Sequence, residues 1–326
     1  MSFDSRFFQL AEDELEQRKL RNERILSQRE REIETKQPEI YKIHHELGLT
    51  SGRLISLILE HDEDFERKLA ELETNNELLQ KRLSESLVRA GYPADYLDKP
   101  CVCRKCGDTG VSEGRRCECF MEIVKKAAAE DINRTSPMSL SDFADFSLSY
   151  YDDKQVTPAG CTAREVMSSN LDFCRNYAEN FHLPCNGILM RGATGLGKTH
   201  LSLSIASEVI KKGYSVIYGS APDLFRKCEQ EHFGREEGNT IDVLLETDLL
   251  ILDDVGAEFE SKFYSAALYN IINNRMNAAK PTIISTNCDL NELVARYGNR
   301  TVSRMKTMDD LIFLGSDVRL MRAGNR

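Results

Sequence analysis

One eight-residue stretch, which begins at Gly192, constrains the fold of this chain more than any other. It reads Gly-Ala-Thr-Gly-Leu-Gly-Lys-Thr and fits the pattern G-x-x-x-x-G-K-[ST], in which backbone N–H groups curl around a phosphate. Residues 187–191 before it are short and mostly apolar, as in a buried strand, and residues 200–210 after it carry apolar side chains at helical spacing. Strand, glycine-rich loop and helix are the context that this motif requires, so the sequence predicts a phosphate-binding loop.

The residues of this loop are expected to have different roles in binding the nucleotide. Glycines allow the backbone to approach a phosphate closely, and the N-terminus of the following helix adds partial positive charge. Lys198 is expected to reach the β- and γ-phosphates, and Thr199 to hold Mg²⁺. The nucleotide-binding set is Gly192, Ala193, Thr194, Gly195, Leu196, Gly197, Lys198 and Thr199.

A second signature lies downstream, where the apolar run 249–252 ends in Asp253 and Asp254. A continuous apolar run is typical of a fully buried parallel strand. Its end places Asp253 beside the Mg²⁺ shell and Asp254 where a carboxylate can polarise the attacking water. Asn287 ends another expected strand, at 282–287, and can orient this water from the opposite side of the γ-phosphate; a solvent-exposed strand-end Asn is the alternative.

Residues 187–326 alternate between expected strands and helices. The strands are expected at 187–191, 215–219, 249–254, 282–287 and 311–314, and helices at 200–210, 221–231 and 261–276. This alternation predicts the α/β class, with a parallel sheet and flanking helices.

The composition bounds the class of protein. A chain of 326 residues suits two domains with room for a small third. Its formal net charge of −10 gives no general attraction to duplex DNA, so any nucleic-acid contact must be local. The sequence has no apolar run long enough to span a bilayer, and its charged N-terminus lacks the apolar centre of a signal peptide. We therefore expect a cytoplasmic protein without a membrane partner.

The first 96 residues are rich in Glu, Arg, Lys and Leu, and glycine and proline are rare there. This composition predicts an all-α region, with a helix at 38–47, a turn at 48–52 and a heptad pattern from Leu54 onward. The heptad residues are Phe65, Leu69, Leu72, Asn76, Leu79 and Leu83. An intramolecular bundle and an intermolecular coiled coil both fit the pattern, and in either case we interpret residues 1–96 as a partner-binding region.

Half of the ten cysteines lie between Cys101 and Cys119. Cys103 and Cys106 form C-x-x-C, and Cys117 pairs with Cys119 after a short polar loop. Four thiolates in a tetrahedron suit Zn²⁺, so these four residues predict a zinc knuckle that metal binding stabilises. Cys101 in place of Cys119, free or redox-active thiols, and an iron–sulfur cluster remain alternatives.

Composition divides the chain into four segments. The helical or coiled-coil region is expected at 1–96, and the knuckle with its following helix at 97–132. A linker and an entry helix follow at 133–186, where Pro137 and several serines and threonines mark a boundary. The α/β core is expected at 187–326.

The second half of the chain resembles AAA+ ATPases of the DnaC/DnaI helicase-loader and IstB-like group. The likeness rests on the phosphate loop, the paired-Asp strand at 249–256 and the Ser-Thr-Asn tip at 285–287. It extends to residues 297–305 and to Gly-Ser-Asp-Val-Arg at 315–319. The resemblance implies that the core binds ATP and Mg²⁺. The helices and knuckle also resemble the amino-terminal half of Gram-positive, phage-related loaders.

The resemblance further implies roles for single residues. Asn287 would be sensor 1, Arg319 sensor 2, and Arg304 an arginine finger inserted into a neighbouring subunit's site. An arginine at the γ-phosphate neutralises developing charge, and one from a neighbour couples hydrolysis to self-assembly. Surface ion pairing is the alternative for both arginines, and Arg300 competes with Arg304. Asp254 stands where most AAA+ proteins have Glu, which implies slow hydrolysis.

These expectations combine into one functional hypothesis. The chain would be an ATP-dependent loader that binds a replicative hexameric helicase, contacts single-stranded DNA and forms a homo-oligomer through Arg304. Two other functions fit the motifs. One is an IstB-like transposition helper that acts on duplex DNA, although the acidic balance and the knuckle count against it. The other is an adaptor that binds ATP without hydrolysing it.

Overall fold

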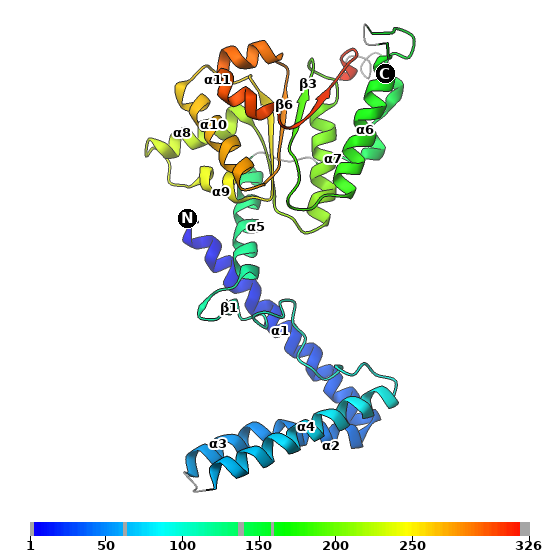
Figure 1. The fold of residues 1–326 in the computed structure, drawn as a ribbon, viewed down its shortest axis with the longest axis vertical. Coiled ribbons are helices and arrows are strands. Elements are labelled where there is room, and N and C mark those ends of the chain that lie inside the picture. Colours follow the sequence, from blue (N-terminus) through cyan, green and yellow to red (C-terminus); the bar gives the residue numbers. More distant parts are fainter. Residues whose placement is uncertain (1–2, 61–63, 136–139, 158–159, 320–326) are drawn as a thin grey trace. The chain divides into compact units, whose positions relative to one another are not determined.

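The computed structural model describes residues 3–60, 64–135, 140–157 and 160–319, and its elements are labelled in Figure 1. The chain divides into two compact units. One consists of residues 12–120, and the other combines residues 1–11 with residues 121–326. Among the described helices, none is long and apolar enough to cross a membrane.

The larger unit is built on a five-stranded parallel sheet, as the sequence predicts. Its spatial order is β4-β5-β6-β3-β7. The strands are β3 (Ile188–Arg191), β4 (Val216–Ser220), β5 (Leu249–Val255), β6 (Thr282–Thr286) and β7 (Asp309–Ile312). The strand before the phosphate loop, β3, therefore lies between β6 and β7 and pairs with both. The last strand was expected at 311–314 but begins two residues earlier, and Phe313 is buried just beyond its end.

Helices cover both faces of this sheet. The helices around the sheet are α5 (Glu118–Thr135), which reaches the edge strand β4, and α6 (Ala163–Glu179), α7 (Lys198–Lys211), α8 (Ala221–His232), α9 (Thr240–Glu246), α10 (Lys262–Asn277) and α11 (Leu290–Met305). Figure 1 shows α6 and α7 on one side of the sheet and α8, α10 and α11 on the other. The two faces explain why the central strands are apolar throughout: Leu249, Leu250, Ile251 and Leu252 are all 0% exposed.

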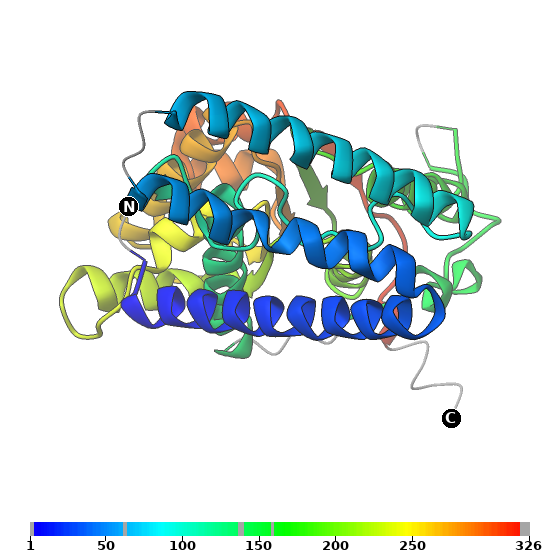
Figure 2. The same cartoon turned by 90° about the horizontal axis from the view of Figure 1, so that it is seen from below.

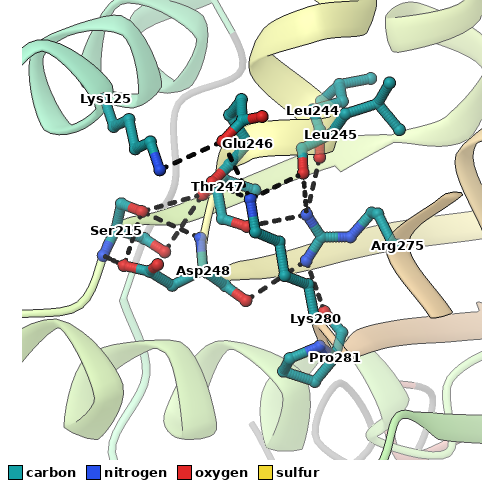
Figure 3. Close-up of polar contacts among 10 residues, drawn as sticks. All are labelled: Lys125, Ser215, Leu244, Leu245, Glu246, Thr247, Asp248, Arg275, Lys280 and Pro281. Carbon is teal, nitrogen blue, oxygen red and sulfur yellow. Dashed lines mark hydrogen bonds and ion pairs between the residues drawn. The ribbon is translucent and has the colours of Figure 1, made fainter. Parts of the chain in front are cut away.

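A buried arginine holds the starts of two central strands together (Figure 3). Arg275 is 0% exposed, and its guanidinium donates to the carbonyls of Leu244, Thr247 and Pro281 at 2.7, 2.8 and 2.6 Å. Its Nε donates to Thr282 Oγ1 at 3.0 Å. Burial lowers the pKa of Arg275 to about 9, which leaves it charged at neutral pH. The cation thus joins the segment before β5 to the start of β6.

The smaller unit is mostly helical. It contains α1 (Ser5–Lys36) from residue 12 onward, α2 (Pro38–Gly48), α3 (Thr50–Glu60), α4 (Phe65–Arg89) and a short hairpin of β1 (Val111–Ser112) and β2 (Arg115–Arg116). Helices α2 and α3 pack along α4 (Figure 2). Ile33, Ile40, Leu87 and Leu97 form its buried apolar cluster.

The heptad residues lie on α4, and Leu79 and Leu83 face helices of the same chain. This packing matches the intramolecular interpretation of the pattern. The turn expected at 48–52 is wrong in extent, because α2 continues to Gly48 and α3 begins at Thr50. Leu49 alone separates the two helices, and its N–H donates to His45 O at 3.2 Å.

Candidate nucleotide site and cysteine cluster

The loop between β3 and α7 has a backbone that only glycine allows. Gly192 has φ 151° and Gly195 has φ 74°, both in the left-handed half of backbone space. A Cβ on Gly192 would lie 2.4 Å from Phe313 O, and one on Gly195 would lie 1.9 Å from Asp317 Oδ1. The loop therefore needs glycine at both positions, because a side chain would be strained and would collide with Phe313 or Asp317. Such a backbone is compatible with N–H groups that curl around a phosphate.

Lys198, the first residue of α7, lies beneath this loop and is 5% exposed. Its Nζ donates to Gly192 O at 2.6 Å, to Ala193 O at 2.7 Å and to Asn287 Oδ1 at 2.8 Å. The lysine thus brings the phosphate loop and the tip of β6 to one point. These partners are exchangeable acceptors, so the ammonium group can turn to a bound phosphate.

Asp253 is the most tightly held carboxylate of the site and is 4% exposed. Thr199 Oγ1 donates to its Oδ2 at 2.9 Å, which brings the two predicted Mg²⁺ ligands together. Tyr218 OH donates to the same oxygen at 2.8 Å, and Ser285 Oγ donates to Oδ1. Tyr218 belongs to no motif, and Ser285 belongs to the Ser-Thr-Asn tip, which gave it no role of its own. An acidic oxygen next to a threonine hydroxyl is a ligand set that Mg²⁺ accepts.

Asp254 leaves the regular strand, with φ 55° and its N–H donated to Ser285 Oγ at 3.0 Å. The pairing of β5 with β6 changes register here, between Leu252 and Val255. Such an irregularity re-aims a side chain, and Asp254 lines the pocket above the loop. Burial and then the charge of Asp253 raise the pKa of Asp254. Burial lowers the pKa of Lys198, although both aspartates oppose this effect.

The pocket has a volume of about 300 Å³, and Lys198, Asp254, Asn287 and Arg319 all line it. Four of the predicted residues from distant segments thus converge on one cavity. Arg319 also forms an ion pair with Asp317, whose Oδ1 lies 3.3 Å from Arg319 Nε. Residues of the 143–151 segment form another wall of this pocket.

Aromatic rings form this wall, which the sequence analysis did not predict. Tyr151 OH donates to Leu196 O of the phosphate loop at 2.9 Å. Phe146 stacks on Tyr151, with ring centroids 5.8 Å apart, and its centroid lies 5.6 Å from that of His200. The aromatic residues clustered at 143–151 are the sequence signal from which this wall could have been predicted. A planar base can stack on such a surface.

Arg304 lies on α11, and it is not among the described residues that line the pocket. Its Nε donates to Asn273 Oδ1 at 2.8 Å, and its guanidinium lies 4.7 Å from the ring centroid of Tyr269. Arg300 is exposed, and its carbonyl accepts from Arg304. A role for Arg304 in a neighbouring subunit's site stays a prediction.

In the smaller unit, the four predicted zinc ligands gather. The Sγ atoms of Cys103, Cys106, Cys117 and Cys119 all lie within 4.8 Å of one another. Cys103 Sγ lies 3.8 Å from Cys117 Sγ, and Cys106 Sγ lies 3.4 Å from Cys119 Sγ. A tetrahedral ion with sulfur ligands at about 2.3 Å separates them by about 3.8 Å, so the cluster fits zinc. Cys101 is exposed and lies outside this group.

The cysteine loops are held in place by one buried carboxylate. Asp108 is 4% exposed and accepts the N–H groups of Val102 at 2.8 Å and Cys103 at 2.9 Å, and the side-chain amide of Asn22 at 2.9 Å. Burial opposes ionisation, but these hydrogen bonds prevail and lower the pKa of Asp108. For Cys106, burial likewise opposes ionisation, while a hydrogen bond from Gly110 and contacts with neighbouring thiols lower its pKa to about 7. Burial and the neighbouring thiols raise the pKa of Cys119, so the four thiols do not ionise together without a metal.

Comparison with known proteins shows what part of this chain is similar to. Residues 161–318 match the family model described as IstB-like ATP binding protein. They form an IstB-like ATP-binding domain. The chain is also similar to the replicative helicase loader DnaC of Escherichia coli K12, with 28% identity over 149 residues. The aligned part is 45% of this chain and 61% of that relative, so it spans less than two thirds of the loader's length.

Other proteins are also similar to part of this chain. The uncharacterized protein YdaV of Escherichia coli K12 is 26% identical over 136 residues, which are 41% of this chain and 55% of that protein. A crystal structure of the DnaC helicase loader has a TM-score of 0.44 and 26% identity and covers 53% of this chain and 98% of that one. A crystal structure of DnaI has a TM-score of 0.45 and 22% identity and covers 58% of this chain and 92% of that one.

Proposed function

We propose that this protein is an ATPase that loads a replicative DNA helicase onto single-stranded DNA. The observation that carries the ATPase part is the convergence of Lys198, Asp254, Asn287 and Arg319 on one pocket over a glycine cradle. The loader part is supported by the similarity to DnaC.

The residues of the pocket fit ATP and Mg²⁺. Thr199 and Asp253 would hold the ion, which would neutralise phosphate charge when bound. Lys198 would exchange its loop carbonyls for phosphate oxygens, and Asp254 would orient and polarise water. Its raised pKa strengthens Asp254 as a proton acceptor.

Arg304 would complete the site of a second copy. It lies outside the pocket of its own chain but at the surface of α11, where a neighbour can meet it. A fixed arginine at a transferring phosphoryl group contributes about 10³-fold or more to turnover. Hydrolysis would then depend on self-assembly.

The smaller unit would bind the helicase. A zinc ion held by its four thiolates would fix the cysteine loops, and the α2–α4 helices would carry the contact surface. This division leaves the nucleotide site free to control binding and release.

Turnover and nucleotide binding test the ATPase part. Lys198→Ala should abolish ATP binding. Asp254→Asn and Arg304→Ala should still bind ATP, and their turnover should fall by about 100-fold or more and by about 10³-fold or more, respectively. Mixing the last two variants should restore activity, because each supplies what the other lacks. Arg300→Ala serves as the matched control, and its loss of activity in place of Arg304→Ala would reassign the finger.

Capture of the cognate helicase tests the loader part. The full-length protein should retain the helicase with ATP and promote its binding to a single-stranded circle. Equal and negligible turnover in wild type and all variants, with helicase binding preserved, would indicate an adaptor. Salt-sensitive duplex binding without helicase capture would indicate a transposition helper and overturn the loader proposal.

A further inference from the structure

Tyr218, which belongs to no motif, contacts Asp253, the carboxylate of the proposed magnesium site. Its hydroxyl donates to Asp253 Oδ2 at 2.8 Å, the same oxygen that accepts from Thr199 at 2.9 Å. The tyrosine lies in β4, where it pairs with Ile251 of β5.

Strand β4 is the edge of the sheet, and an asparagine of α5 covers its free side. The side-chain amide of Asn133 donates to Val216 O at 2.7 Å, and its oxygen accepts the N–H of Tyr218 at 3.0 Å. One donor and one acceptor on the same side chain thus replace the two ladder bonds that a neighbouring strand would make. This pairing fixes the backbone of Tyr218 on the side away from β5.

A second contact anchors α5 to the same unit. Lys125 Nζ lies 3.1 Å from Glu246 Oε2, and the two side chains are 28% and 19% exposed (Figure 3). Glu246 also pairs with Lys280 at 3.1 Å. Helix α5 is therefore attached near the start of β5 as well as along β4. Both attachments precede residue 161, where the match to the ATP-binding family begins.

We propose that Tyr218 is a positioning residue for Asp253, and that Asn133 sets the place of Tyr218, so that α5 tunes the affinity of the site for Mg²⁺. The proposal rests on the function proposed above. Asp253 is presented by three hydroxyl donors, and removing one lets the carboxylate rotate away from the ion. Groups that orient a metal ligand through a hydrogen bond contribute about 10- to 100-fold to metal affinity.

The test is a magnesium titration of fluorescent ATP binding to full-length protein, followed in parallel by the Mg²⁺ dependence of turnover. Tyr218→Phe should raise the Mg²⁺ concentration for half-maximal binding about tenfold. Its affinity for the ATP analogue in EDTA should equal that of wild type, which a general loss of structure would not allow. Tyr214→Phe is the matched control, because Tyr214 packs against Phe181 and makes no contact with Asp253.

Asn133→Ala should shift the magnesium curve in the same direction by a smaller factor. Because Asn133 acts through Tyr218, the double variant should need no more Mg²⁺ than Tyr218→Phe alone. Asn133→Asp provides a second variant of the same shape, whose carboxylate keeps the bond to Tyr218 N–H and loses the bond to Val216 O.

Two results would overturn the proposal. One is a wild-type magnesium curve for Tyr218→Phe, and the other is an Asn133→Ala shift that adds fully to that of Tyr218→Phe. Failure of wild type to bind ATP would instead overturn the proposed function. The two failures are distinguishable, since the first leaves the ATP affinity of wild type intact.

Discussion

Tyr297 donates its hydroxyl proton to Oε1 of Glu258, a carboxylate that is 5% exposed. The other oxygen of Glu258 accepts the N–H of Gly256 at 2.9 Å, and its backbone carbonyl accepts from Arg296 at 2.9 Å. Glu258 follows β5, which ends in the two aspartates, and Tyr297 lies on α11, the helix that carries Arg304. This relationship joins the loop after Asp254 to the proposed subunit contact.

Tyr297→Phe should therefore affect stability and assembly-dependent turnover together. The variant leaves Glu258 buried with one donor fewer, which costs about 1–3 kcal/mol of unfolding free energy. Urea unfolding measures this loss, and turnover measured against protein concentration should reach its half-maximum at a higher concentration. Tyr214→Phe is the control. If the two variants have the same unfolding free energy and the same concentration dependence of turnover, Glu258 does not position α11.

Replacing the buried arginine should destabilise the larger unit strongly. Arg275→Met leaves the buried carbonyls of Leu244, Thr247 and Pro281 without their hydrogen-bond donor. We expect a loss of about 3 kcal/mol or more, since each unsatisfied buried acceptor costs about 1–3 kcal/mol. Arg226→Met, which removes an exposed ion pair with Asp223, should cost less than about 1 kcal/mol. Denaturant unfolding compares them, and similar losses would contradict the expectation.

Asp254→Asn should raise the melting temperature of the nucleotide-free protein. The pKa of Asp254 in the folded chain lies above its ordinary 3.8, so its ionised form opposes folding at pH 7. Asparagine removes this charge and tolerates the positive φ. The gain should shrink as the pH falls through the raised pKa and vanish below 3.8, where both states are protonated. Asp172→Asn is the exposed control, and a pH-independent gain would exclude the electrostatic cause.

Purified protein should contain one zinc ion per chain. Cys106→Ser should lose the metal, and Cys101→Ser should retain it, because only Cys106 belongs to the four-sulfur cluster. Chelation should release the ion and abolish the cooperative melting of residues 12–120, since the bound metal supplies much of the stability of a small knuckle. Metal analysis and calorimetry measure both effects; a Cys101→Ser variant without zinc would change the ligand set.

The sequence predicted those parts of the candidate site whose residues belong to a motif. The loop from Gly192 to Thr199 and the apolar run before Asp253 lie where expected, because steric demands on a phosphate cradle and burial of a central strand act over a few neighbouring residues. Asn287 and Arg319 also reach the predicted pocket. The ends of elements were less predictable: the turn at 48–52 is one residue long, and the last strand begins at Asp309.

The donors around Asp253 could not be predicted in this way. Tyr218 and Ser285 lie in different strands and meet Asp253 only through the lateral order of the parallel sheet. Asp254 points into the pocket because its positive φ breaks the alternation of side chains along β5. Neither relationship leaves a local signal in the sequence.

The sequence by itself determined a phosphate loop, a buried strand that ends in two aspartates, and a set of paired cysteines. Tertiary structure decided which side chains surround Asp253, placed Cys119 rather than Cys101 among the four thiols, and set Asn133 on the edge of β4. The physical reason is the distance along the chain over which each interaction acts. The conformation of a loop and the apolar pattern of a strand depend on nearby residues, whereas a hydrogen bond between distant segments exists only after the strands have taken their order in the sheet.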